Sequence, residues 1–264
     1  MRVGVSSCIV RELGGGPLSI DDVDIVELSA EDIPLFHRDG SINHEMLRSL
    51  DSFDVAFSLH VPNSNATLRE IRINLAKKLR RNIEVVERCL EIASSLDIKH
   101  VVVHGGAASQ SLRDYRIAFL NTLENLAYIA DLARDHQVLL CVENLCDDCV
   151  GCIPAELLAI IQMTGVCATV DTGHALITSV KYGFDPEDFF YTLAPFVQHV
   201  HLHSNNGLKD EHLPIYEGIL DIKSVMNAIC HVRPANVILE IRRFSRYEDV
   251  IKSLNTVRQC VFVF

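Results

Sequence analysis

Short apolar segments alternate with longer amphipathic stretches along the chain. Eight short segments of five to seven residues are rich in Val, Ile and Leu: Arg2–Ser6, Asp24–Ser29, Val55–Val61, His100–His104, Val138–Asn144, Cys167–Asp171, Val197–His203 and Asn236–Ile241. Apolar runs of this length are typical of parallel strands that are buried on both faces. The pattern therefore predicts eight strands.

The stretches between these segments predict helices. Residues 68–96 and 111–136 have apolar side chains near helical spacing, the first as one long helix or two. Further helices are predicted to start at Pro154, Pro186 and Asp221, and the last to cover Ser245–Gln259. The helical pattern is weakest after the first two strands, where Gly and Pro interrupt it.

Strands that alternate with helices eight times over about 250 residues predict a single (β/α)8 TIM barrel spanning residues 1–264. The main rival is an open doubly wound sheet, which usually carries a Gly-rich phosphate loop after its first strand. No such loop follows Arg2–Ser6, and the three glycines at 14–16 precede no helical pattern. No internal repeat or linker divides the chain.

Composition narrows the classes of function. The formal net charge is −11, which argues against broad electrostatic binding of nucleic acid or of an anionic membrane. No apolar run is long enough for a membrane span, and the first residues do not resemble a secretory signal. We therefore predict a cytoplasmic protein whose nine Cys are reduced thiols.

Polar residues mark the carboxyl ends of six consecutive predicted strands. They are His60, His104, Glu143, Asp171, His201 and Glu240. In a barrel these ends face one shared site. Because buried unpaired carboxylates cost several kcal/mol each, a shared cation would explain the set better than six separate structural roles.

Two short motifs add candidate ligands. In Asp171-Thr172-Gly173-His174 a turn at the glycine would let Asp171 and His174 face one centre. In Asp210-Glu211-His212 an extended backbone would place the first and third side chains on one face. Nine candidate ligands exceed what one ion can use, whereas two or three ions that share bridging carboxylates can use them all.

Several motifs together resemble the endonuclease IV and xylose isomerase-like superfamily of TIM barrels. They are SLHVP (58–62), VVHGG (102–106), VEN (142–144), DTGHA (171–175), HLHSN (201–205), DEH (210–212) followed by Glu217-Gly218, and LEI (239–241). The resemblance implies a multinuclear zinc site with the ligands His60, His104, Glu143, Asp171, His174, His201, Asp210, His212 and Glu240.

The first functional prediction is a phosphoester hydrolase with two or three Zn²⁺ ions, in which Glu143 bridges two ions. Glu143, Glu240 and His203 are its candidate catalytic residues, and Arg242 and Asn205 are candidate contacts for the substrate. The substrate would be an abasic-site duplex or a smaller phosphoester. DNA is the less favoured of these, because the loops after the second and third strands have few bulky side chains and the chain has no Trp.

The alternative prediction follows the sugar isomerase and epimerase branch of the same superfamily. There one Mn²⁺, Mg²⁺ or similar ion is held by the equivalents of Glu143, Asp171, His201 and Glu240, and the two glutamates move protons on a sugar. This mechanism does not require His60, His104, Asp210 or His212. A barrel that has lost catalysis is a third interpretation, but no expected ligand is missing.

A C-x2-C-x2-C stretch at Cys146, Cys149 and Cys152 follows the fifth predicted strand. Three thiols at this spacing are able to bind zinc or part of an iron–sulfur cluster. The fourth ligand of the ferredoxin pattern is absent, and no second C-x2-C exists elsewhere in the chain. A cysteine metal site is therefore the weaker interpretation of this stretch.

Overall fold

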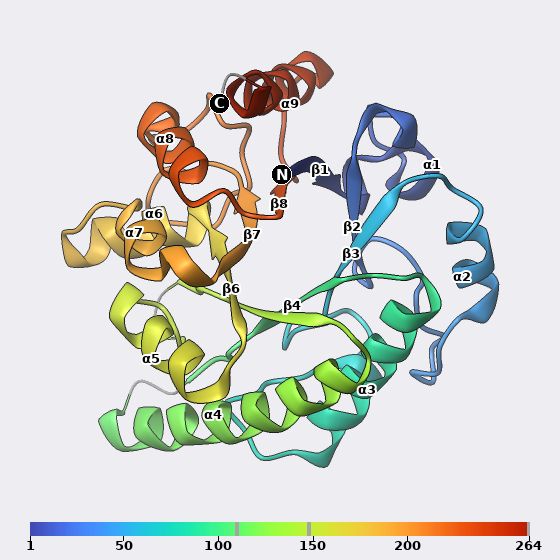
Figure 1. Ribbon diagram of the computed structural model, residues 1–264, viewed down its shortest axis with the longest axis vertical. Helices are drawn as coiled ribbons and strands as arrows, with labels where there is room; N and C mark the ends of the chain where they lie inside the picture. The colour runs from blue at the N-terminus through green and yellow to red at the C-terminus, as the bar shows by residue number, and fades with distance from the viewer. Residues whose placement is uncertain (109–110, 147–148, 263–264) are drawn as a thin grey trace.

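The computed structural model describes residues 1–108, 111–146 and 149–262. Its strands are β1 (Arg2–Ser6), β2 (Ile25–Ser29), β3 (Ala56–His60), β4 (His100–His104), β5 (Leu139–Glu143), β6 (Cys167–Asp171), β7 (Val197–Leu202) and β8 (Asn236–Leu239). They pair in parallel and in chain order, and β8 pairs with β1 to close the barrel (Figure 1). The predicted eight-stranded barrel is thus confirmed.

Helices surround this barrel and connect successive strands. They are α1 (Arg11–Gly14), α2 (His44–Leu50), α3 (Arg80–Ser95), α4 (Leu112–Asp135), α5 (Pro154–Thr164), α6 (Thr172–Tyr182), α7 (Asp188–Leu193), α8 (Ile222–Val232) and α9 (Tyr247–Phe262). Four 3-10 turns lie at Ser7–Ile9, Ile20–Asp22, Arg69–Ile71 and Ala194–Phe196. The weak intervals after β1 and β2 hold the short helices α1 and α2, as their broken pattern suggests.

Residues 68–96, predicted as one long helix or two, contain the 3-10 turn Arg69–Ile71 and the helix α3. The helix predicted to start at Pro186 begins two residues later, as α7. The stretch between β6 and β7 also contains a helix that the sequence did not predict. This helix, α6, begins at Thr172, and the expected turn at Gly173 is its first turn.

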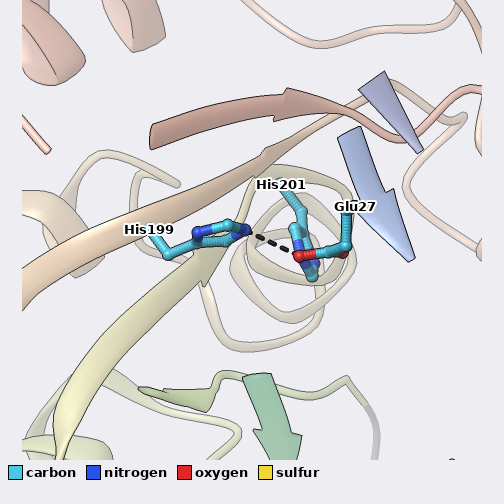
Figure 2. Close-up of side chains that lie close together, drawn as sticks. All are labelled: Glu27, His199 and His201. Atoms are coloured by element: carbon cyan, nitrogen blue, oxygen red, sulfur yellow. Dashed lines mark hydrogen bonds and ion pairs between the residues drawn. The ribbon is translucent and has the colours of Figure 1, made fainter. Parts of the chain in front are cut away.

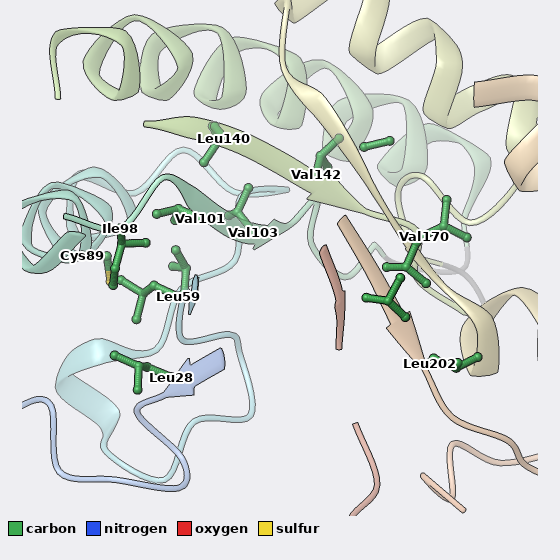
Figure 3. Close-up of a cluster of buried hydrophobic side chains, with 14 of the residues drawn as sticks. Leu28, Leu59, Cys89, Ile98, Val101, Val103, Leu140, Val142, Val170 and Leu202 are labelled. Atoms are coloured by element: carbon green, nitrogen blue, oxygen red, sulfur yellow. The ribbon is translucent and has the colours of Figure 1, made fainter. Parts of the chain in front are cut away.

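Alternate residues of each strand face opposite sides of the barrel wall. The side that faces the helices is apolar and carries the main core, as Leu59, Val101, Val142 and Leu202 illustrate (Figure 3). These side chains are fully buried between strand and helix. Packing of the helices onto this outer face therefore stabilises the barrel.

The side that faces the barrel axis carries polar residues instead. Glu27 on β2, Ser58 on β3 and His199 on β7 are buried there, and they contact one another. Because β2 and β7 are not neighbours in the sheet, such contacts must cross the interior. Barrel interiors are usually filled by branched apolar residues. The polar interior of this barrel therefore indicates a functional site at the carboxyl ends of the strands.

Candidate functional site

Glu143, at the end of β5, contacts four of the other eight predicted ligands. Its carboxylate is buried, and Oε2 lies 3.2 Å from Nε2 of His60 and 3.2 Å from Nε2 of His104. Its other oxygen, Oε1, lies 3.2 Å from Nδ1 of His174. One carboxylate thus contacts imidazoles from β3, β4 and α6.

His201, on β7, lies among three acidic residues from the ends of other strands. Its Nδ1 is 3.4 Å from Glu240 Oε2, 3.5 Å from Glu143 Oε2 and 3.8 Å from Asp171 Oδ2. This nitrogen is buried and has no hydrogen-bond partner. A buried polar atom that is left without a partner is rare in native proteins and calls for a ligand.

The chemistry of these four side chains fits a divalent cation. One imidazole and three carboxylates form a donor set suited to Mn²⁺, Mg²⁺ or Zn²⁺. Positive charge among Glu143, Asp171 and Glu240 would also offset their mutual repulsion.

The start of α6 explains how Asp171 and His174 come together. Asp171 is the N-cap of this helix, and its Oδ1 accepts a 2.7 Å hydrogen bond from the backbone N–H of His174. Nδ1 of His174 then lies 3.6 Å from the same carboxylate. Helix capping, and not a free turn at Gly173, places the pair.

The loop after β7 supplies Asp210 and His212. Asp210 Oδ2 lies 2.9 Å from Nε2 of His212 and 3.3 Å from Nε2 of His174. The backbone is not extended here as predicted, because His212 has a φ of 50°. The bend turns His212 towards β8, where its Nδ1 lies 2.9 Å from the carbonyl oxygen of Glu240.

All nine predicted ligands therefore belong to one connected network of contacts. Five groups of three have donor atoms within 4.8 Å of one another: Glu27, His199 and His201; His60, His104 and Glu143; His203, Asp210 and His212; Glu143, Asp171 and His174; and Asp171, His201 and Glu240. How many of these groups bind an ion stays a prediction.

His203 and Asn205 are both buried behind this network. Nε2 of His203 lies 3.0 Å from Asp171 Oδ2, and its ring packs so closely against Gly173 that a Cβ there would be 2.0 Å from Cε1. Asn205 donates to the carbonyl of Gly173 and accepts from the N–H of Gly207. Both ends of its amide thus bind the surrounding backbone, and its predicted contact with a substrate is untested.

Arg242 joins the site to the loop after β2. Its guanidinium lies 3.3 Å from Oε1 of Glu240 and 3.0 Å from Oδ1 of Asp32. Asp32 also accepts a 3.0 Å hydrogen bond from the hydroxyl of Ser7. Sequence patterns pointed to Arg242 but not to Asp32, since nothing local links two residues that lie 210 positions apart.

Glu27 is the main site-associated residue that sequence patterns did not reveal. It is buried on β2, and Oε2 lies 2.8 Å from Nε2 of His199 while Oε1 lies 2.8 Å from Nε2 of His201 (Figure 2). A glutamate inside the apolar segment Asp24–Ser29 was the available signal. The pattern of polar residues at strand ends does not indicate Glu27, because it lies within the strand.

The charged groups of the site shift one another's pKa values. Burial raises the pKa of Glu143, but the imidazoles of His104 and His201 outweigh it and hold this pKa well below its usual range. Burial likewise lowers the pKa of His60, yet its bond to Glu143 raises the value to about 9. The carboxylate at the centre of the network is thus ionised at neutral pH.

A cavity of about 500 Å³ opens onto the network. Glu143, Glu240 and Asp210 line it on one side, and Asn63, Ser64 and Asn65 line it from the loop after β3. The only Arg or Lys among the described lining residues is Arg242, which two carboxylates already neutralise. Without bound cations the cavity would therefore repel an anion.

The C-x2-C-x2-C stretch borders this cavity. Cys146 and Cys149 line it, whereas Cys152 is buried behind them. The intervening Asp147 and Asp148 lie outside the described residues. None of the candidate three-residue metal groups found in the described part of the chain includes a cysteine.

Comparison with protein families shows to which family the chain belongs. The model of the xylose isomerase-like TIM barrel family matches residues 20–260. The chain belongs to this family. Its relatives include two uncharacterized proteins of Methanocaldococcus jannaschii, one 27% identical over 79% of this chain and 71% of its own, the other 25% identical over 85% and 86%.

Solved structures of this barrel family share the fold along the whole chain. A D-tagatose 3-epimerase-like protein has a TM-score of 0.78 at 24% identity and covers 100% of this chain and 98% of its own. The 3-keto-D-glucoside 4-epimerase of E. coli has a TM-score of 0.71 at 14% identity, with 98% and 100% covered. A Thermus thermophilus protein soaked with ZnCl2 has a TM-score of 0.69 at 19% identity, with 100% and 99% covered.

No helix in the described ranges of this family member has the length and apolar character needed to cross a membrane.

Proposed function

We propose that this protein is a metal-dependent sugar epimerase or isomerase with one catalytic ion. The observation that carries the proposal is the unpartnered Nδ1 of His201, buried between Glu143, Asp171 and Glu240. These four side chains would hold the ion. When bound, a divalent ion supplies Lewis-acid polarisation of a substrate carbonyl and its neighbouring hydroxyl.

Glu143 and Glu240 would carry the proton transfers. They come from β5 and from just after β8, so they approach a molecule in the cavity from different sides of the barrel. One carboxylate takes the proton from the carbon beside the carbonyl, and the other, which has first taken up a proton from solvent, gives that proton to the opposite face of the carbon. The C–H bond is broken and remade, and the configuration is inverted.

The electrostatic state of both glutamates suits this role. Burial raises the pKa of Glu240, but His212 and then His201 lower it below its usual value. Glu143 is held low in the same way by His104 and His201. In the free protein both are ionised at neutral pH, as the base must be, so the residue that acts as the acid has to take up a proton before it returns one.

The lining of the cavity favours a neutral polyol over an anion. Asn63, Ser64 and Asn65 offer amide and hydroxyl groups, while the only permanent positive charge in the described lining, Arg242, is paired with Glu240 and Asp32. Hydroxyl groups of a sugar would match these donors and acceptors. Two of the solved structures with this fold are named as sugar epimerases or as similar to one, which supports the same substrate class.

Incubation in D2O tests the proposal. Protein loaded with Mn²⁺, Mg²⁺ or Zn²⁺ is mixed with a panel of ketoses and 3-keto-glycosides, and deuterium at the carbon beside the carbonyl is followed by NMR. We expect incorporation with at least one substrate and about one ion per chain by elemental analysis. Absence of exchange across the panel would count against an epimerase.

A multinuclear zinc phosphoester hydrolase is the second candidate. The observation in its favour is that His60, His104 and Glu143 form an additional group of donors that one-ion chemistry does not need. Extra cations would also reverse the negative charge of the cavity. Two or more Zn²⁺ ions per chain, together with cleavage of an abasic-site duplex or a small phosphodiester, would replace the first proposal by this one.

A further inference from the structure

Glu27 lies one layer deeper in the barrel than the four proposed ion ligands. It is on β2, and Figure 2 shows its carboxylate between the rings of His199 and His201, which both come from β7. All three side chains are buried. Glu27 also lines the cavity, so the cluster joins the cavity to the interior of the barrel.

The two carboxylate oxygens have different partners. Oε2 accepts hydrogen bonds from His199 Nε2 at 2.8 Å and from the hydroxyl of Ser58 at 3.2 Å. Oε1 lies 2.8 Å from Nε2 of His201, within ion-pair distance although not aligned with the ring N–H as a hydrogen bond. The contact with His201 is therefore separable from the contacts on the other side of the carboxylate.

The ring of His201 has one nitrogen on each side. Nε2 faces Glu27, and Nδ1 faces Glu143, Asp171 and Glu240. A carboxylate beside one ring nitrogen keeps the proton on that nitrogen and leaves the lone pair of the other available to a metal. Rotation of the ring by half a turn would remove the facing nitrogen from the three carboxylates.

We propose that Glu27 is a positioning residue that fixes the ring orientation and tautomer of His201, so that Nδ1 presents its lone pair to the ion. This inference rests on the metal centre of the proposed function. Glu27 also lines the cavity, and its proposed effect comes from its contact with His201. Its effect is transmitted through His201 alone, which separates it from the catalytic pair Glu143 and Glu240.

Glu27→Gln is the variant that tests the inference, because it keeps size and shape and removes the charge. Outer carboxylate partners of a metal-bound imidazole change metal affinity by about 10- to 100-fold when mutated. We expect the Kd for Zn²⁺, measured by competition with a chromophoric chelator, to rise by that factor. With Co²⁺ as probe, the d–d absorption bands should shift, because the angle of His201 to the ion changes.

Ser58→Ala is the matched control. It removes a buried hydrogen bond to the same carboxylate, but on the oxygen that faces away from His201. We expect its melting temperature to fall while its Zn²⁺ affinity and Co²⁺ spectrum stay within about twofold of wild type. An equal loss of affinity in both variants would mean that Glu27 acts only by stabilising the fold, and would overturn the inference.

Wild-type protein provides a measurement that does not depend on how the variants fold. A long-range 1H–15N spectrum of the Zn²⁺-loaded protein, with His201 assigned from its absence in His201→Gln, should show a proton on Nε2 and the metal shift on Nδ1. The reverse assignment would overturn the proposal. So would the loss of one whole ion per chain in Glu27→Gln, since Glu27, His199 and His201 would then hold an ion of their own.

The inference and the proposed function fail in different ways. If wild-type protein binds no divalent ion, both are wrong. If wild-type protein binds one ion and Glu27→Gln binds it equally well with an unchanged Co²⁺ spectrum, only the role of Glu27 is wrong.

Discussion

The site has two parts that differ in chemistry and in access. The inner part is the carboxylate centre, formed by His201, Glu143, Asp171 and Glu240, in which His201 and Asp171 are fully buried. The outer part is the imidazole rim, formed by His60, His104, His174 and His212, whose side chains are 10–21% exposed. Both parts offer metal ligands, but only the inner part leaves a buried nitrogen without a partner.

The partners of the two parts indicate which of them depends more on a bound ion. The imidazoles of the rim have carboxylate partners in the protein itself, such as Glu143 for His104 and Asp210 for His212. The carboxylate centre brings three acids within 3.8 Å of one unpartnered nitrogen, an arrangement that a cation would stabilise. We therefore expect the centre to carry the proposed reaction and the rim to tune it.

Removal of the metal should have the largest effect. Dialysis against a chelator is expected to lower epimerisation by about a thousandfold or more, because Lewis-acid polarisation is worth several kcal/mol. Returning the ion at about 100 times its Kd should restore activity and add about 2.7 kcal/mol to the free energy of unfolding, which thermal denaturation measures. Full activity after complete chelation would contradict the proposal that the carboxylate centre depends on a bound ion.

Loss of either proton-carrying glutamate should come next. In Glu143→Gln and Glu240→Gln we expect turnover to fall by about 10²- to 10⁴-fold, since each variant removes one general base. Solvent-deuterium exchange with each epimer separately should show which face of the carbon each residue serves. Glu31→Gln, at the edge of the cavity, is the matched control and should retain turnover within about twofold. Equal activity in all three variants would exclude both glutamates as bases.

Arg242 connects the centre to Asp32, and its loss should have an intermediate effect. Arg242→Gln removes a charged partner of Glu240, so kcat/KM should fall by about ten- to a hundredfold. Steady-state kinetics measures this, with Arg243→Gln on the neighbouring residue as control. A loss as large in the control would show that general charge, and not the contact with Glu240, is responsible.

The imidazole rim should show the smallest effect. His104→Gln removes an imidazole partner of Glu143, and we expect epimerisation to fall by less than about tenfold. The same variant would abolish most of a two-ion phosphoester hydrolysis, because His104 would then be an ion ligand. Epimerase assays and metal counts on this variant thus show which part of the site holds the catalytic ion.

Much of the site could be predicted because its signals are local. His60, His104, Glu143 and Asp171 each end an apolar run, and parallel strands in a barrel must direct such ends to one rim. The number and order of the strands were therefore enough to predict that these residues share one site. The helix α6 was missed because its start, Asp171-Thr172-Gly173-His174, is equally typical of a turn.

Other features could not be predicted in this way. Glu27 and His199 are separated by 172 positions, and Arg242 and Asp32 by 210. Their contacts depend on which residues meet across the barrel once its wall has closed. Neither the alternation of polar and apolar residues nor any short motif encodes that distance.

Strand periodicity and strand direction are local properties of the chain, so the amino-acid pattern is enough to predict eight strands alternating with helices and a collection of acids and imidazoles at their carboxyl ends. Which nitrogen of His201 faces the carboxylates, and that Glu27 lies on the other side of its ring, depends on the folded barrel. Those relations arise when the parallel sheet closes on itself and brings β2 and β7 to opposite sides of one polar interior.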